Sequence, residues 1–270
     1  MRMALIFGLV LGSASAAHGY ELVSGESDLD TVTGKQLTIG CPKGTVALGA
    51  GWAALDETDA INVGKATYFA PSWDGASWLT NVTSGDGGEA WKLRVTVVCA
   101  DPLDGYQVVL EETSVDAVPS KQIQPSCGRG RVATGAGFEV LDQTGAILDG
   151  ESTYFMAAWD ASGWLINARN DSGGDWKLRS RLICVSAEAV PGLEVVTEDS
   201  DYSDFPSKQV IGDCPRGKRV TSGGWGVLDE TDAILEGAPT YSMPGWDGTT
   251  WMTNASFDGK WKLRASTTCL

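Results

Sequence analysis

The 270-residue chain carries 35 Asp and Glu against 20 Lys and Arg, a formal net charge of −15, and its one histidine is His18. Such an acidic chain is not expected to bind nucleic acid or anionic membrane surfaces, whose phosphates would repel it. A single histidine near the N-terminus excludes Ser-His-Asp and Cys-His catalysis in the body of the chain, together with imidazole-rich metal sites.

The first residues have the features of a secretory signal peptide. Arg2 supplies a positive charge, residues 4–12 form an apolar run, and Ala14-Ser15-Ala16 provides small residues for cleavage. The apolar run is too short to cross a bilayer. We therefore expect residues 1–16 to be removed and the product to be secreted and extracellular, without membrane insertion.

The rest of the chain contains three copies of one unit, at residues 17–104, 105–191 and 192–270. Each copy has a Lys-Gln pair, a cysteine in a turn, a glycine-rich stretch ending in an aromatic residue, a Trp-Asp pair, and a Trp-Lys-Leu-Arg segment before a second cysteine. In the first copy these features start at Lys35, Cys41, Gly49, Trp73 and Trp91. No long linker separates the copies, so we expect them to stand close together.

Two cysteines occur in each copy. In an exported chain they indicate disulfides rather than thiol chemistry. The repeat predicts the pairs Cys41–Cys99, Cys127–Cys184 and Cys214–Cys269.

The dominant local pattern is alternation, which predicts β-strands. In the closing segment of the first copy, Trp91, Leu93, Val95, Val97 and Cys99 fall on one face of a strand. Asp-Gly turns follow Trp73 and Trp246, and no long helical periodicity is present. We predict an all-β chain of three tandem disulfide-closed antiparallel sandwich or barrel modules, each with about five or six strands, which could pack with pseudo-threefold symmetry.

A Trp-Asp pair, a second tryptophan and an asparagine recur in each copy, and they form the candidate ligand site. Indoles can stack on the apolar faces of a sugar while carboxylates and amides bind its hydroxyl groups. The alternative is structural, with a cross-strand aromatic pair in the core, aspartates in turns and asparagines at strand ends. The candidate residues are Trp73, Asp74, Trp78, Asn81, Trp159, Asp160, Trp164, Asn167, Trp246, Asp247, Trp251 and Asn254.

Two further repeated segments have simpler interpretations. In the Trp-Lys-Leu-Arg segment the alternation turns Lys92 and Arg94 outward, where they could balance neighbouring acids or contact an acidic ligand. The acidic segment at residues 55–59 offers oxygen ligands for calcium, but the middle copy loses two of its charges. An ordinary hairpin turn is the stronger interpretation of that segment.

Carboxylate catalysis remains open, because glycoside hydrolysis needs two suitably spaced acids. Two sets of acids occupy equivalent positions in the three copies, namely Asp56, Asp142 and Asp229, and Asp74, Asp160 and Asp247. Such repetition fits three equal sites or turns better than one active site. We therefore expect no enzyme, no catalytic residues, no cofactor and no metal, and we keep a carbohydrate-active enzyme as the third hypothesis.

The order of these motifs, from Tyr20-Glu21-Leu22-Val23 through the Lys-Gln pair and Cys41-Pro42-Lys43-Gly44 to the cysteine-ended last strand, resembles Cys-bounded β-modules of secreted bacterial proteins and of pilus-tip and phage tail-fibre adhesins. The resemblance runs through all three copies and implies a small β-fold displayed outside the cell. Our first hypothesis is an adhesin-like or lectin-like protein with three similar weak sites for glycans or a cell-surface component. The alternative is a structural or surface-coat protein without a small ligand.

Overall fold

The computed structural model describes residues 19–84, 88–170 and 172–270, so the predicted signal peptide and His18 lie outside the described residues. Each repeat contributes six strands. The first contains β1 (Glu21–Glu26), β2 (Gly34–Gly40), β3 (Val46–Leu55), β4 (Gly64–Pro71), β5 (Ser77–Ser84) and β6 (Lys92–Ala100). The second contains β7 (Gln107–Glu112), β8 (Ser120–Ile123), β9 (Arg131–Asp142), β10 (Glu151–Ala157), β11 (Trp164–Arg169) and β12 (Trp176–Ser186). The third contains β13 (Glu194–Asp199), β14 (Ser207–Asp213), β15 (Val220–Leu228), β16 (Ala238–Pro244), β17 (Thr250–Ser256) and β18 (Lys262–Cys269).

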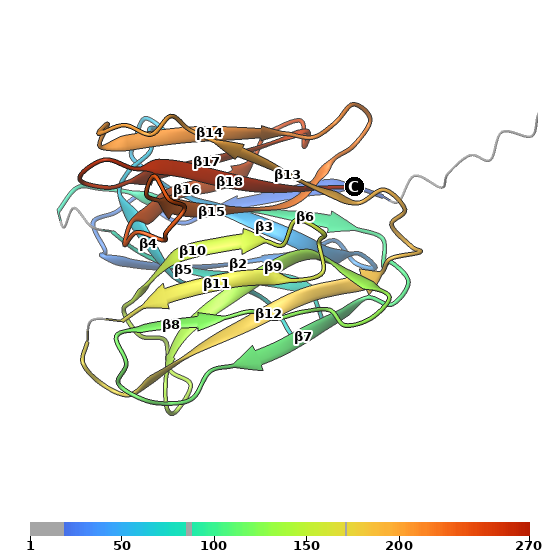
Figure 1. Cartoon of the computed structure of the whole chain (residues 1–270), viewed down its shortest axis with the longest axis horizontal. Helices are drawn as coiled ribbons and strands as arrows, with labels where there is room; N and C mark the ends of the chain where they lie inside the picture. Colours follow the sequence, from blue (N-terminus) through green and yellow to red (C-terminus); the bar gives the residue numbers. More distant parts are fainter. Residues whose placement is uncertain (1–18, 85–87, 171) are drawn as a thin grey trace, which may run out of the picture.

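The strands form three six-stranded antiparallel sheets, which confirms the all-β prediction (Figure 1). Their orders are β1-β6-β3-β16-β17-β14, β7-β12-β9-β4-β5-β2 and β13-β18-β15-β10-β11-β8. In each sheet, the first, sixth and third strands of one repeat continue into the fourth, fifth and second strands of another. The three sheets are therefore related by a cyclic exchange of repeats, which is the arrangement of a pseudo-threefold molecule.

Glycines make the junctions between repeats possible. The sheets join at β3–β16, β4–β9 and β10–β15. A Cβ placed on Gly51, Gly137 or Gly224 would overlap a backbone carbonyl of the neighbouring repeat. The glycine-rich stretch after the first cysteine of each copy thus serves close packing of backbones.

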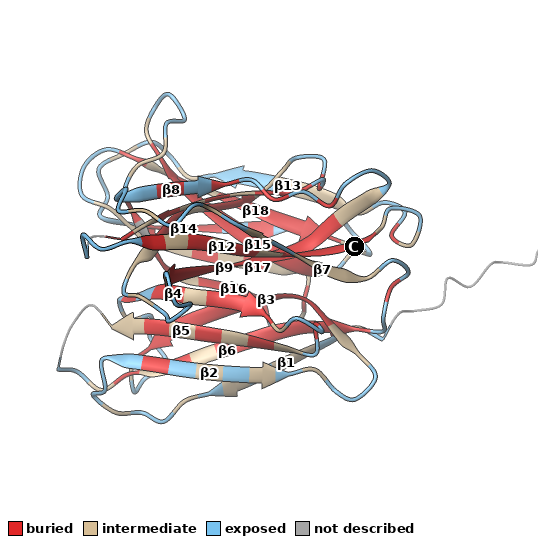
Figure 2. Cartoon of the chain, turned by 90° about the horizontal axis from the view of Figure 1, so that it is seen from below, coloured by how far each residue is buried: buried red, intermediate tan, exposed pale blue. Residues whose placement is uncertain are grey.

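One core is shared by all three repeats. Phe138 lies between the other repeats, with ring centroids 6.3 Å from Phe69 and 6.3 Å from Trp225. Phe155 stacks near Trp225 at 4.8 Å. Burial is greatest in the inner strands, whereas the edge strands β2, β8 and β13 alternate or combine exposed residues with more buried ones (Figure 2). Each repeat is therefore a disulfide-closed module of two three-stranded half-sheets, and each half-sheet completes a sheet with a neighbouring repeat.

The three predicted disulfides are confirmed. Cys41–Cys99, Cys127–Cys184 and Cys214–Cys269 have Cα–Cα distances of 5.7, 5.5 and 5.6 Å. Cys41 follows β2, whereas Cys99 lies in β6, and these two strands belong to different sheets. Each disulfide therefore closes one repeat and links two sheets.

The repeated Lys-Gln motif has a structural role in the fold. Lys35, Lys121 and Lys208 are buried, with each ammonium 5.1, 5.2 and 4.8 Å from the ring centroids of Trp91, Trp176 and Trp261, respectively. Backbone carbonyls of the preceding loop, such as that of Asp28, accept hydrogen bonds from the ammonium groups. The lysines thus fasten the loop between the first and second strands to the last strand.

Candidate functional site

Three tryptophans protrude from equivalent hairpin turns. Trp73, Trp159 and Trp246 lie in the β4–β5, β10–β11 and β16–β17 turns and are 82%, 85% and 95% exposed. The other eight of the eleven tryptophans are buried. The first indole of each predicted pair is therefore on the surface.

Each exposed indole is followed by an aspartate that shapes its turn. The backbone N–H groups of Ala76, Ser162 and Thr249 donate to Oδ1 of Asp74, Asp160 and Asp247 at 3.0, 3.0 and 2.9 Å. The Ser72 hydroxyl and the Ala76 N–H lower the pKa of Asp74. These aspartates are held as turn residues, which is the structural alternative for this part of the motif.

All three turns lie at one end of the molecule. The carbonyls of Gly75, Ala161 and Gly248 accept hydrogen bonds at 2.8, 2.6 and 2.8 Å from three backbone N–H groups. The donors are Ala47, Ala133 and Val220, which lie at or near the starts of β3, β9 and β15. Val220 donates one of these bonds and also pairs with Cys269, so the third turn lies beside the C-terminus. Because the strands run along the long axis, the turns gather at the end that carries the label C in Figure 1.

The second tryptophan of each pair is in the core, so the expected platform of two indoles does not form. Trp78, Trp164 and Trp251 are at most 1% exposed. Trp78 packs on Phe69 and Trp164 on Phe155, with centroids 4.9 and 4.5 Å apart. The reason is the two-residue period of the strand, which turns these positions toward the interior. Trp78 and Trp164 enter the core shared by the repeats, whereas Trp251 packs in a second buried cluster with Leu48 and Val98.

The asparagines are also held by the fold rather than presented beside the indoles. Oδ1 of Asn81, Asn167 and Asn254 accepts the hydroxyl hydrogen of a threonine at 3.0, 2.8 and 2.8 Å. Those threonines, Thr67, Thr153 and Thr240, are the residues at which β4, β10 and β16 change register. The asparagines therefore stabilise three equivalent β-bulges.

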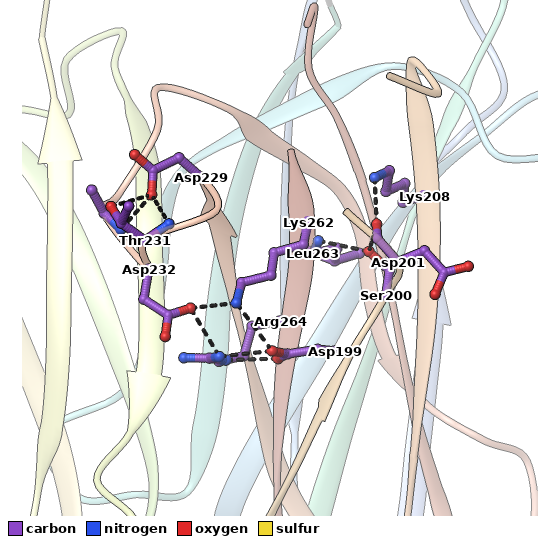
Figure 3. A network of polar contacts seen from close by, with 11 residues as sticks. Asp199, Ser200, Asp201, Lys208, Asp229, Thr231, Asp232, Lys262, Leu263 and Arg264 are labelled. Carbon is purple, nitrogen blue, oxygen red and sulfur yellow. Dashed lines mark hydrogen bonds and ion pairs between the residues drawn. The ribbon is translucent and has the colours of Figure 1, made fainter. Parts of the chain in front are cut away.

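The outward Lys-Arg pairs balance neighbouring acids, one of the two expected roles. Lys262 and Arg264 lie between Asp199 and Asp232, with nitrogen–oxygen distances of 3.5, 2.5, 2.7 and 3.1 Å (Figure 3). The ion pairs lower the pKa values of both aspartates and raise that of Arg264. Lys92 and Arg94 pair with Glu26 and Asp59 in the same way.

The middle repeat reaches charge balance by another route. Gly145 occupies the position of Asp59 and Asp232, and Glu139, which is 1% exposed, supplies a carboxylate instead. Arg179 and Arg181 contact Glu139 at 3.0 and 2.6 Å. The carboxylate that Asp59 and Asp232 supply from the turn in the other repeats is thus supplied in the middle repeat by Glu139 on strand β9.

The acidic segment that was weighed as a calcium site is a self-contained turn. Oδ1 of Asp56 accepts hydrogen bonds from the Thr58 N–H and hydroxyl and the Ala60 N–H, which lower its pKa. Asp59 is engaged by Lys92. Among residues 19–84, 88–170 and 172–270, no group of three or more His, Cys, Asp or Glu is placed to hold a metal ion, and no helix is long and apolar enough to cross a membrane.

A repeated tyrosine escaped the sequence reasoning. Tyr68, Tyr154 and Tyr241 stand five residues before Trp73, Trp159 and Trp246, on the outer faces of the sheets. Burial raises the pKa of each phenol, to about 12 for Tyr68. Their regular spacing from the exposed tryptophan could have identified them in the sequence. The structure shows in addition that an arginine of another repeat lies near each tyrosine, namely Arg181 for Tyr68, Arg264 for Tyr154 and Arg94 for Tyr241.

The surface thus offers three exposed indoles on turns braced by hydrogen bonds, and Trp246 shares a groove with Tyr241 at a junction of repeats. This arrangement can bind a ligand by stacking, whereas the nearby carboxylates are committed to turns and ion pairs. Comparison of the chain with protein-family models and with curated proteins finds no match.

Proposed function

We propose that this protein is a secreted, adhesin-like or lectin-like protein that binds carbohydrate through three indoles at one end of the molecule. The observation that carries the proposal is the exposure of Trp73, Trp159 and Trp246 in three equivalent turns. A tryptophan that serves only stability belongs in the core, where the other eight lie. The recurrence of the exposed indole at the same turn in all three copies supports a role in ligand contact.

The turns suit stacking on the apolar face of a pyranose. Hydrogen bonds within each turn hold the backbone that carries the indole. A rigid support reduces the ordering entropy lost on binding, so a single aromatic contact retains more of its free energy. The formal net charge of −15 favours neutral over acidic glycans as ligands.

The common position of the turns supports multivalent binding. Three weak contacts made to one surface gain avidity, because the second and third contacts form within a complex that already exists. The three disulfides are typical of proteins that work in oxidising surroundings, outside the cytoplasm. A glycan-coated cell surface is an environment where both properties are useful.

A glycan array tests this proposal with three proteins. The parent is compared with the triple variant Trp73→Ala/Trp159→Ala/Trp246→Ala and with the control Phe205→Ala. Phe205 is 69% exposed, and its carbonyl accepts the indole N–H of Trp261 at the far end of β18 from the three turns. Circular dichroism and thermal unfolding check that each variant is folded.

The expected result is glycan binding by the parent and the control, and a loss of ~10-fold or more in the triple variant. Absence of glycan binding by the parent overturns the proposal and favours a coat protein. Unchanged binding by a folded triple variant also overturns it.

A further inference from the structure

One of the three indoles stands at the end of a groove. A cavity of about 450 Å³ lies on the outer face of the sheet that joins the first and third repeats, beside Trp246. Tyr241, Met243 and Met252 give it an apolar floor. Ser24, Arg94 and Thr96 of the first repeat give it a polar wall.

We propose that this groove binds a neutral oligosaccharide of at least two rings, which makes the Trp246 site the principal one of the three. The inference rests on the proposed carbohydrate-binding function and deepens it. Tyr241 and Trp246 offer two aromatic surfaces along one path, so that neighbouring sugar rings can contact both. A cavity of this size lies within the range of small-molecule sites.

The polar wall fits a ligand rich in hydroxyl groups. The Ser24 and Thr96 hydroxyl groups are 2.7 Å apart, and either can act as the donor of the bond between them. A hydroxyl pair of this kind can both donate to and accept from a sugar. Arg94 brings no unbalanced charge, because Glu26 and Asp59 pair with it, so the groove favours a neutral ligand.

The equivalent face of the sheet between the first and second repeats carries longer side chains. Arg181 stands where Thr96 stands, and its guanidinium donates to the Pro71 carbonyl at 3.0 Å across the junction. Its other partner, Glu139, occupies the position of Ala53. The long side chains therefore occupy the space beside Trp73 that remains open beside Trp246.

The third face differs because a methyl group is missing. Gly226 occupies the position of Ala53, and a Cβ placed on it would lie 2.7 Å from the ring of Tyr154. The ring of Tyr154 therefore packs directly against Gly226. Ala53 supplies that Cβ in the first repeat, and Tyr241, which packs against Ala53 and Met243, lines the groove.

The test measures glycan affinity after removal of each indole separately. It also measures affinity in variants whose groove is filled by a larger side chain while all three indoles remain. Parent, Trp73→Ala, Trp159→Ala, Trp246→Ala and Thr96→Arg are titrated with a panel of neutral hexasaccharides, namely α-1,4- and β-1,4-linked glucose, β-1,4-linked N-acetylglucosamine and α-linked mannose. Isothermal calorimetry gives the affinity. Thr96→Arg copies Arg181, and Ser24→Leu copies the exposed Leu110 as a second way of filling the groove.

The expected result is a loss of ~10-fold or more in Trp246→Ala and in a folded groove-filling variant, against less than ~3-fold in Trp73→Ala and Trp159→Ala. Equal losses in the three tryptophan variants overturn the groove and leave the trivalent function standing. Unchanged affinity in folded Thr96→Arg or Ser24→Leu also overturns the groove. A parent that ignores the neutral panel but binds acidic glycans on the array overturns the neutral ligand, whereas binding to no glycan overturns the proposed function itself.

Discussion

Tyr106 of the second repeat closes over Gly75 of the first, directly beside the turn that carries Trp73. Its hydroxyl donates to the Ala47 carbonyl at 2.9 Å, and a Cβ placed on Gly75 would overlap the phenol ring. Tyr20 lies against Gly248 in the same way and donates to the Val220 carbonyl at 3.0 Å. Two of the three indole-bearing turns are thus held by a tyrosine from the next repeat in the ring.

The remaining turn carries the complementary pair of residues. Ala161 occupies the glycine position with a φ of 54°, and Leu193 occupies the tyrosine position. The copy that has alanine instead of glycine in the turn therefore also has leucine instead of the tyrosine that would pack on it. We predict that Gly75→Ala alone destabilises the protein by about 1–3 kcal/mol, because the new Cβ displaces Tyr106 and the φ of 68° is strained for alanine.

A double-mutant cycle checks this coupling by urea unfolding. In Gly75→Ala/Tyr106→Leu, which copies the Ala161 and Leu193 pair, the loss should be smaller than the sum of the two single losses. Additive losses would show that the two positions do not depend on one another.

Removal of one disulfide should destabilise the whole molecule rather than one module. Cys41 and Cys99 are 58 residues apart, and loop-closure entropy for a loop of this length corresponds to about 4 kcal/mol. Because the sheets and the core are shared by the three repeats, Cys41→Ala/Cys99→Ala should still unfold in a single transition. Calorimetry measures both quantities, and a separate early transition in this variant would contradict a shared core.

Much of the fold could be predicted from the sequence. The alternation from Trp91 to Cys99 predicted a strand with one buried face, and the repeat predicted each disulfide. The exchange of half-sheets could not be predicted, because it depends on which backbone approaches which glycine. Gly51 and Gly137 look alike in the sequence, yet their neighbours across the junction come from different repeats.

Stability in acid should depend on the ion pair between Asp116 and Lys121, whose atoms are 2.5 Å apart. The Lys121 ammonium, the Ser114 hydroxyl and the Val118 N–H lower the pKa of Asp116 from 3.8 to about 2. A carboxylate with a lowered folded-state pKa stabilises the fold above its unfolded pKa, and this contribution is lost as the pH falls through the folded value. The window for Asp116 therefore runs from about pH 5 down to pH 2.

Asp116→Ser, which copies Ser203 of the third repeat, removes this contribution. Its urea midpoint should be below that of the parent at pH 6, and the difference should vanish near pH 2. The reverse change, Ser203→Asp, should raise the midpoint at pH 6 by placing a carboxylate near Lys208, whose ammonium donates hydrogen bonds to the backbone carbonyls of Asp201, Ser203 and Trp261. A difference between parent and Asp116→Ser that is constant from pH 6 to pH 2 would contradict this role.

The candidate site was only half predictable. The two-residue alternation of strand β5 predicts that the side chain of Trp78 points into the core. Alternation predicts no direction for the side chain of Trp73, because residues of a turn do not alternate between two faces. The groove beside Trp246 could not be anticipated, since it depends on the small side chains of Ala53 and Thr96 in another repeat.

Hydroxyl-radical footprinting with mass spectrometry tests most directly whether the three turn indoles contact the ligand. The protein is oxidised alone and with the glycan that binds most strongly on the array. Trp73, Trp159 and Trp246 should be the tryptophans oxidised fastest in the free protein, and the bound glycan should protect them, Trp246 most of all. Unchanged oxidation of all three indoles in a protein saturated with glycan would contradict the account.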